Sequence, residues 1–188
     1  YVPVTDESTL TAALADSSSD VIRLTSDIKL SNELQITNNR KVTLDLNGYV
    51  LDLGGKHISV SALSGDPWYH SNQLTIIDSD PTKHHKFTDN DGLWKLDENG
   101  DKTVSGGVIT GGKSKTATGY RTGGGVDVYG GTFTMTGGSI VGCKAESGGG
   151  VCIVYDYTAQ KTSEFIMKGG SIIGCTASSG GGVLIRSG

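Results

Sequence analysis

The sequence has little proline, cysteine or aromatic character: three Pro and three Cys occur among 188 residues, and 6% of residues are aromatic. So little proline excludes a collagen helix or a proline-rich linker, and three cysteines are too few for a disulfide framework. No run of 18 apolar residues occurs, so no membrane insertion is predicted. The formal charge of −4, with scattered Lys and Arg, argues against a nucleic acid partner.

Motifs that bind cofactors or metals are missing as well. The sequence contains no GxSxG elbow and no CxxC pair. Residues 107–114, GVITGGKS, have the spacing GxxxxGK[ST], but no helix is expected after them, so they are not predicted to form a phosphate-binding loop. His84 and His85 are adjacent, so their side chains diverge on an extended chain. The oxygen-rich stretches 89–92 and 97–101 could suggest calcium, but turn chemistry explains them better. The sequence therefore predicts no cofactor and no metal.

Glycine is in excess: 29 of the 188 residues are Gly, about twice the usual share of roughly 7%. Much of it belongs to a duplicated block, GGGVDVYGGTFTMTGGSIVGC at 123–143 and GGGVCIVYDYTAQKTSEFIMKGGSIIGC at 148–175. A third copy begins at Gly180. A repeat of fixed period indicates one structural unit stacked on copies of itself, each covering the apolar face of the next.

Short stretches before the repeat alternate apolar and polar residues with period two, which is typical of strands. These stretches are 21–24, 28–30, 34–36, 42–46, 50–53, 58–60 and 74–76. About three such strands per unit, with no helix between them, predict an all-β parallel β-helix of roughly five coils. Glycine doublets and triplets are expected at the corners, where coils pass closely or φ is positive.

The predicted domain organisation has three parts. Residues 1–20 form an N-terminal cap with a short helix, and residues 21–188 form the β-helix. We expect the β-helix to continue beyond Gly188 in the native protein, since the third copy is incomplete. Residues 78–103 are predicted to be an inserted loop with a hairpin between strands at 93–96 and 102–104.

The alternation also predicts which side chains form the core. The inward set is Val126, Val128, Phe133, Met135, Ile140, Val151, Ile153, Phe165, Met167, Ile172, Val183 and Ile185. Cys143 and Cys175 occupy equivalent places, and both a disulfide and a ladder of reduced thiols remain open. Cys152 is expected to point outward, and Asp45 and Asp52 to lie on solvated strand faces.

The segment VTLDLNG at 42–48 and the repeated FTMTGGSIxGC…SGGGV block resemble the pectin-lyase-like right-handed parallel β-helix superfamily. Within it the chain is similar to repeat-bearing surface proteins of Gram-positive gut bacteria. This resemblance covers nearly the whole chain from about residue 5 and implies a secreted or cell-surface protein. It also implies an adhesin-like role, including superantigen-like binding of immunoglobulin variable regions.

The same superfamily contains polysaccharide lyases and glycoside hydrolases, so an enzyme is an alternative. Pectin-cleaving hydrolases of this kind resemble one another in an Asn-x-Asp, an Asp-Asp and a Gly-His-Gly. The last two do not occur here, and Asn99-Gly100-Asp101 lies in the predicted inserted loop and not on a coil. Glycoside hydrolysis needs two carboxylates flanking the bond, but Ile77 is expected opposite Asp45 on the next coil. The sequence therefore predicts no catalytic residues and no enzyme.

The remaining hypothesis is binding through residues that interrupt the repeat. Trp, Tyr and Arg concentrate binding energy at interfaces. A flat β-helix face with outward residues such as Asp127 also suits a protein partner. A host protein, with immunoglobulin as the leading candidate, is the predicted partner; a carbohydrate-binding or structural stalk module, with glycans as ligands, is the alternative. The predicted binding residues are Tyr155, Asp156, Tyr157, Trp68, Tyr69, Tyr120, Arg121 and Tyr129. Packing of each aromatic ring over its own corner remains open.

Overall fold

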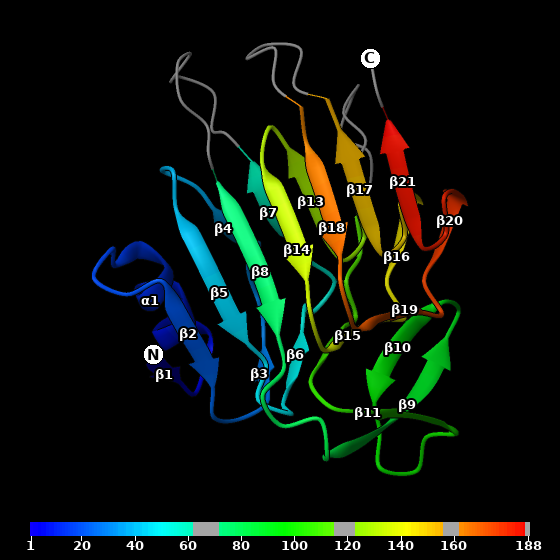
Figure 1. The fold of residues 1–188 in the computed structure, drawn as a ribbon. Coiled ribbons are helices and arrows are strands. Elements are labelled where there is room, and N and C mark those ends of the chain that lie inside the picture. The colour runs from blue at the N-terminus through cyan, green and yellow to red at the C-terminus, as the bar shows by residue number, and fades with distance from the viewer. Residues whose placement is uncertain (62–71, 115–122, 156–161, 187–188) are drawn as a thin grey trace.

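The computed structural model describes residues 1–61, 72–114, 123–155 and 162–186, and it confirms the predicted parallel β-helix. Each coil contributes one strand to each of three parallel sheets (Figure 1). Sheet A runs β1 (Val2–Val4), β2 (Val21–Leu24), β5 (Lys41–Asp45), β8 (Gln73–Ile77), β14 (Thr132–Met135), β18 (Glu164–Met167). Sheet B runs β3 (Ile28–Lys29), β6 (Val50–Asp52), β12 (Val108–Thr110), β15 (Ser139–Val141), β19 (Ser171–Ile173).

Sheet C completes the coil. It runs β4 (Leu34–Ile36), β7 (Ile58–Ser61), β13 (Val126–Tyr129), β17 (Val151–Val154), β21 (Val183–Arg186). Two further strands, β16 (Lys144–Ser147) and β20 (Thr176–Ser179), pair in parallel between sheets B and C. No helix in the described part of the chain has the length and apolar character needed to cross a membrane.

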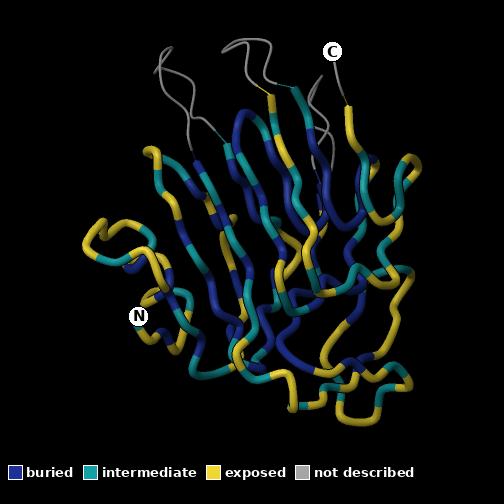
Figure 2. Tube along the Cα trace, in the orientation of Figure 1, coloured by how far each residue is buried: buried dark blue, intermediate teal, exposed yellow. Residues whose placement is uncertain are grey.

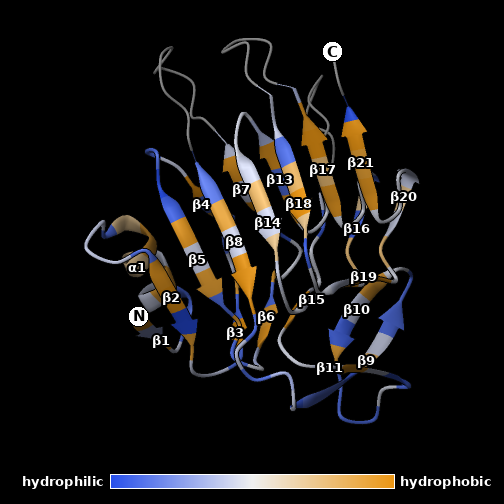
Figure 3. Ribbon diagram, viewed as in Figure 1, coloured by the Kyte–Doolittle hydropathy of each residue, from blue (hydrophilic) through white to orange (hydrophobic). Residues whose placement is uncertain are grey.

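Equivalent residues of successive coils stack to form the core. The Phe133 and Phe165 rings lie 5.2 Å apart between centroids, and Met135 pairs in register with Met167. Apolar residues gather in the strands (Figure 3), where the tube in Figure 2 is mostly buried or half-buried. Stacking in register therefore gives each inward side chain an identical or similar neighbour above and below.

The last described coil differs from the predicted core. Phe165, Ile172 and Val183 are only partly buried, although they pack against the core. Met167 is 46% and Ile185 70% exposed. The physical reason is that a coil is covered by its neighbours, and among the described residues no strand lies beyond β18, β19 and β21.

The first residues form a helix and a strand. Helix α1 (Glu7–Ala15) starts with a capping box: Asp6 accepts the Thr9 amide at 2.8 Å, and Thr9 Oγ1 accepts the Asp6 amide at 3.1 Å. The guanidinium of Arg40 donates to carbonyls near the helix end, including that of Leu14 at 3.1 Å. In addition, β1 pairs in parallel with β2, so this segment contributes a strand to sheet A as well as a helix.

The insertion after sheet A forms a three-stranded antiparallel flap, which differs from the predicted hairpin. Its strands are β9 (His84–Asn90), β10 (Leu93–Leu96) and β11 (Lys102–Ser105), with β9 in the centre. The predicted strands at 93–96 and 102–104 therefore each pair with β9 and not with each other. The hairpin prediction was wrong because His84–Asn90 contains one apolar residue, Phe87, and reads as a polar loop.

The flap creates a second apolar core on the outside of sheet B. Phe87 and Trp94, whose ring centroids lie 6.2 Å apart, are buried together with Val104 of the flap. They pack in one cluster with residues of sheet B, namely Val50, Val108 and Val141. Sheet B is therefore covered on both faces at β12 and β15, where every residue is buried.

Two repeated glycines make room for the flap. A Cβ added at Gly142 would lie 2.1 Å from Trp94 Cγ, and one at Gly174 would lie 2.4 Å from Trp94 Cζ2. Both glycines also have positive φ. Their recurrence in the repeat thus reflects packing against the indole as well as a corner conformation.

The glycine triplets serve a different purpose, the close passage of neighbouring coils. A Cβ at Gly149 would lie 2.3 Å from the carbonyl oxygen of Gly181. The Gly149 amide donates to the Gly180 carbonyl at 3.0 Å, and the Val151 amide donates to Gly182 at 2.9 Å. A side chain at Gly149 would separate the two backbones and break these hydrogen bonds.

Replacing Gly142 with Ala tests the contact with the flap. We expect G142A to unfold at lower urea than G55A, because only the former adds a steric clash with Trp94, while both place Ala at positive φ. Overpacking of this kind costs about 2 kcal/mol, or a melting temperature lower by about 4–8 °C for a chain of this size. Equal stability of the two variants would contradict the packing role.

Candidate functional site

The outer face of sheet C carries a row of polar side chains from successive coils. The register aligns Gln35 of β4 with Ser59 of β7, Ser59 with Asp127 of β13, and Asp127 with Cys152 of β17. Glu33 and His57 directly precede Leu34 and Ile58, which pair with each other, so the two polar side chains also lie next to each other on adjacent coils. We call these six residues the polar row. Parallel pairing in register is what brings them together, because they come from four coils.

Asp127 is the least satisfied member of the polar row. It is 7% exposed, and its Oδ1 atom is buried without a hydrogen-bond partner. Burial raises the pKa of Asp127 to about 7, although the nearby charge of His57 and a hydrogen bond from the Gly123 backbone act in the opposite direction. With this pKa the Asp127 carboxyl is protonated below neutral pH, and in that form it can donate a hydrogen bond.

His57 forms an ion pair with Glu33 at the more open end of the polar row. Its Nε2 lies 3.4 Å from Glu33 Oε1. Burial opposes the charged imidazole, but the hydrogen bond and charge of Glu33 outweigh it and raise the pKa of His57. The hydrogen bond from His57 in turn lowers the pKa of Glu33. The row thus combines an ion pair with a protonatable buried carboxyl.

A cavity of about 550 Å³ adjoins this open end, lined by residues of α1 and β4. Leu14 and Leu34 provide apolar surface, while Glu33, Gln35 and Arg40 provide polar groups. The cavity and the polar row therefore share Glu33 and Gln35.

The strands of sheet C end along one edge, which we call the C-terminal rim. Ser61, Tyr129 and Val154 are register partners at the ends of their strands, and the ends of β13, β17 and β21 lie at the upper margin of Figure 1. Tyr155 follows directly, its amide donating to the Arg186 carbonyl at 3.1 Å. In the sequence, Ser61 directly precedes segment 62–71, and Tyr155 directly precedes segment 156–161.

The structure places two of the eight predicted binding residues. Tyr129 and Tyr155 lie at the C-terminal rim, and both are partly buried. The other six lie outside the described residues: Trp68, Tyr69, Tyr120, Arg121, Asp156 and Tyr157. Sequence reasoning did not select Glu33 or His57, although aligning the alternating strands coil by coil would have placed their side chains on one face with that of Asp127.

Two sequence expectations about sheet C were wrong. Cys152 was expected to point into solvent, yet it is fully buried, while lying outside the main core cluster that holds Val151 and Ile153. Asp127 likewise was expected to be an exposed contact on the flat face. Both have the outward parity expected of them, but the outer face of β13 and β17 is not open to solvent.

The carboxylates considered for catalysis do not form a pair. Asp45 was expected to be solvated, but it is fully buried and accepts hydrogen bonds from Arg23 Nε at 2.7 Å and from the Asn47 and Ser79 amides. Although burial opposes its charge, these donors lower the pKa of Asp45. Its register partner is Ile77, as the sequence predicts. Asp45 therefore stabilises a corner and is not placed to protonate a glycosidic bond.

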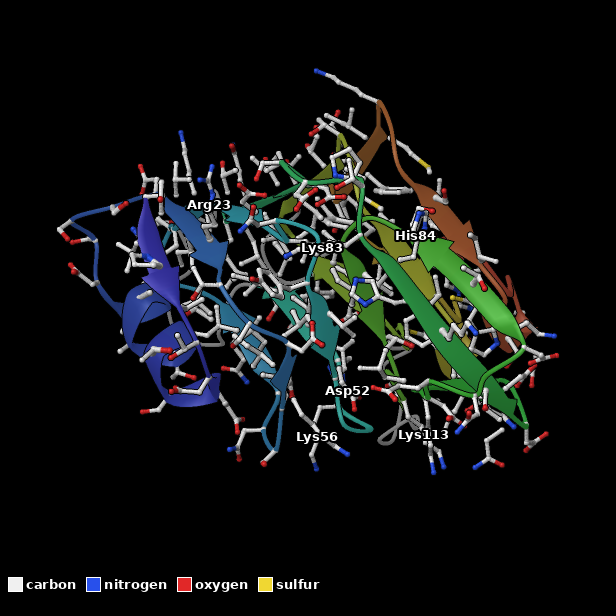
Figure 4. All side chains as sticks on the ribbon, turned by 90° about the horizontal axis from the view of Figure 1, so that it is seen from below. Arg23, Asp52, Lys56, Lys83, His84 and Lys113 are labelled. Atoms are coloured by element: carbon white, nitrogen blue, oxygen red, sulfur yellow. The ribbon has the colours of Figure 1, made fainter. Side chains whose placement is uncertain are left out.

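Charged residues also gather at the corner between sheets B and C. Asp52, Lys56 and Lys113 lie along one margin of the molecule, apart from Arg23 (Figure 4). Lys144, the bridge partner of Lys113, forms an ion pair with Asp91 at 2.7 Å. Among the described residues, no group of three His, Cys, Asp or Glu side chains is arranged to hold a metal ion.

One family comparison gives a match. A sequence model of the family described as "putative pectate lyase-like adhesive domain" matches residues 1–105, more than half of the chain. The matched part includes α1, the first coils and the flap, whereas the duplicated block lies beyond it. Searches of curated proteins and of solved structures give no match.

The protonation of Asp127 predicts how stability changes with pH. Folding raises the pKa of Asp127, so the protonated carboxyl contributes to folding stability at low pH. This contribution is lost as pH rises from about 4 to about 7. The raised pKa of His57 acts in the same direction, whereas Glu33 contributes stability that is lost below its ordinary pKa. We expect the free energy of unfolding to fall by about 2–3 kcal/mol between pH 5 and pH 8.

Urea denaturation at the two pH values measures this loss. D127N should remove most of the pH dependence, because the amide cannot ionise. D101N, at a solvent-exposed carboxylate on the flap, is the matched control and should leave the dependence unchanged. An unchanged dependence in D127N would contradict the assignment.

Proposed function

The chain belongs to the family of pectate lyase-like adhesive domains, and from this premise we propose that it is a non-catalytic binding module of a secreted or cell-surface protein. Membership in an adhesive family supports binding over catalysis. The corner role of Asp45, opposite Ile77, supports the same choice, since glycoside hydrolysis requires two facing carboxylates.

The observation that carries the proposal is the C-terminal rim. Three successive strands end there in register at Ser61, Tyr129 and Val154. In the sequence, the segment with Trp68 and Tyr69 follows Ser61 directly, and the segment with Asp156 and Tyr157 follows Tyr155. A rigid sheet edge that carries aromatic-rich insertions is a usual way to build a binding surface.

We propose a host protein as the partner, with immunoglobulin variable regions as the leading candidate. A surface made from a flat sheet and its rim suits a protein partner, because protein interfaces are broad while small ligands prefer concave pockets. In this proposal Tyr129 and Tyr155 contribute from the described rim, and the remaining predicted residues contribute from the insertions.

A glycan is a second candidate, favoured by the polar row. Carboxyl, imidazole, amide and hydroxyl groups lie side by side there, and Asp127 Oδ1 has no hydrogen-bond partner among the described residues. Sugar hydroxyls both donate and accept hydrogen bonds, so they can pair with carboxyl groups in either protonation state. The cavity beside Glu33 and Gln35 gives such a ligand an approach.

Binding of purified immunoglobulin Fab, measured by biolayer interferometry, tests the leading candidate. We expect Y155A and Y157A each to raise Kd by about tenfold or more, the size of effect that loss of an interface aromatic gives. Y1A is the matched control, because Tyr1 is an exposed tyrosine beside Arg23 at the N-terminal end of sheet A.

The outcomes separate the candidates. Unchanged Fab affinity in both rim variants would contradict the rim as the binding surface. No Fab binding by the wild-type chain, together with saturable binding to a glycan array that D127N and E33Q weaken, would support the second candidate instead.

A further inference from the structure

The two equivalent cysteines of the repeat lie side by side in successive coils. Val141 pairs with Ile173 on one side of them and Lys144 with Thr176 on the other, so register holds across the corner. The Thr176 amide donates to the Cys143 carbonyl at 2.9 Å. Neighbouring parallel strands lie about 4.8 Å apart, which is within the Cα separation that a disulfide spans.

The Cys175 sulfur lies against the backbone of the coil that carries Cys143. The Cys143 amide lies 3.5 Å from Cys175 Sγ, and Cys175 Sγ lies 3.8 Å from the Ile140 carbonyl beneath it. Each sulfur packs against an equivalent glycine, since Cβ atoms built at Gly125 and Gly150 would lie 3.4 Å from Cys143 Sγ and Cys175 Sγ respectively. The thiols thus occupy matching places in two stacked coils.

Both thiols are reduced in this structure, and they differ in their surroundings. Cys143 is fully buried, whereas Cys175 is partly exposed. A hydrogen bond from the Cys143 thiol lowers the pKa of Cys175, while that same contact and burial raise the pKa of Cys143. Cys175 is therefore the thiol that reacts first with an oxidant, because the thiolate is the nucleophile.

We propose that Cys143 and Cys175 form a modification site: a reversible disulfide that links the last two described coils. Its co-reactant is a small disulfide such as oxidised glutathione. This inference is independent of the proposed binding function, because it concerns the corner between sheets B and C and not the C-terminal rim.

The reaction proceeds in two exchange steps. The Cys175 thiolate attacks one sulfur of the small disulfide, which forms a mixed disulfide and releases one small thiolate. The Cys143 sulfur then attacks Cys175 Sγ and releases the second small thiolate, which takes up the Cys143 proton as it leaves. The protein gives up two electrons and two protons, and the small disulfide is reduced to two thiols.

The geometry also indicates that this disulfide is easily reduced. A disulfide prefers Cβ atoms about 3.8 Å apart, whereas stacking in register holds equivalent atoms at about the strand spacing of 4.8 Å. Closing the bond pulls two coils together against their hydrogen-bonded spacing. Strained disulfides have higher reduction potentials and act as reversible rather than permanent links.

Peptide mapping of the wild-type chain tests the proposal. The chain is incubated with oxidised glutathione, free thiols are alkylated, and the digest is analysed by mass spectrometry. We expect a Cys143–Cys175 linked peptide and an alkylated Cys152, with the link lost again in excess reduced glutathione. A linked peptide that contains Cys152, a stable glutathione adduct on Cys175 without the link, or a link that resists reduced glutathione would overturn it.

Two variants sharpen the experiment. C143A should stop at the glutathione adduct on Cys175, because the second thiol is missing. C152A is the matched control, since it removes another buried thiol of the same block and should leave the link intact. Loss of the link in C152A with a native circular dichroism spectrum would contradict the assignment.

Discussion

Pairing between equivalent residues of successive coils is the constraint on which the rest of this structure depends. Each coil donates backbone hydrogen bonds to its neighbour, as in the bonds from Val126 to Gly150 and from Val151 to Gly182. This pairing fixes the position of every side chain relative to its counterpart one coil away. The phenylalanine stack, the paired cysteines and the polar row of sheet C are all consequences of it.

The same constraint decides which additions the fold accepts. Insertions leave from corners and strand ends, so they do not disturb the register of the coils. The flap buries the outside of sheet B. Contact of Trp94 with Gly142 and Gly174 fixes the position of the flap on this sheet. The outer face of sheet C is also buried at Ser59, Asp127 and Cys152. Its rim, where Tyr129 and Tyr155 are only partly buried, is therefore the described part of this sheet best suited to contact a partner.

The fold could be predicted from the sequence because two independent periodicities agree. The duplicated block indicates stacked units, and period-two alternation indicates the strands within them. Burial on the outer faces could not be predicted, since it depends on what covers a face and not on alternation. Asp127 and Cys152 have outward parity and are buried all the same, and Asp45 is buried by donors from Arg23 and Ser79 on neighbouring coils. The sequence of β9 contains one apolar residue, Phe87, so it shows no alternation of apolar and polar residues that would predict a strand.

Two of the predicted binding residues, Tyr129 and Tyr155, lie on the rim where register brings strand ends together. We propose that the coils are a scaffold and that the C-terminal rim binds the partner. Hydrogen–deuterium exchange with and without Fab tests it most directly. We expect Fab to leave the protection of backbone amides in sheets A and B unchanged and to add protection next to Ser61, Tyr129 and Tyr155. Added protection confined to the flap, or to the strands of sheet A, would contradict it.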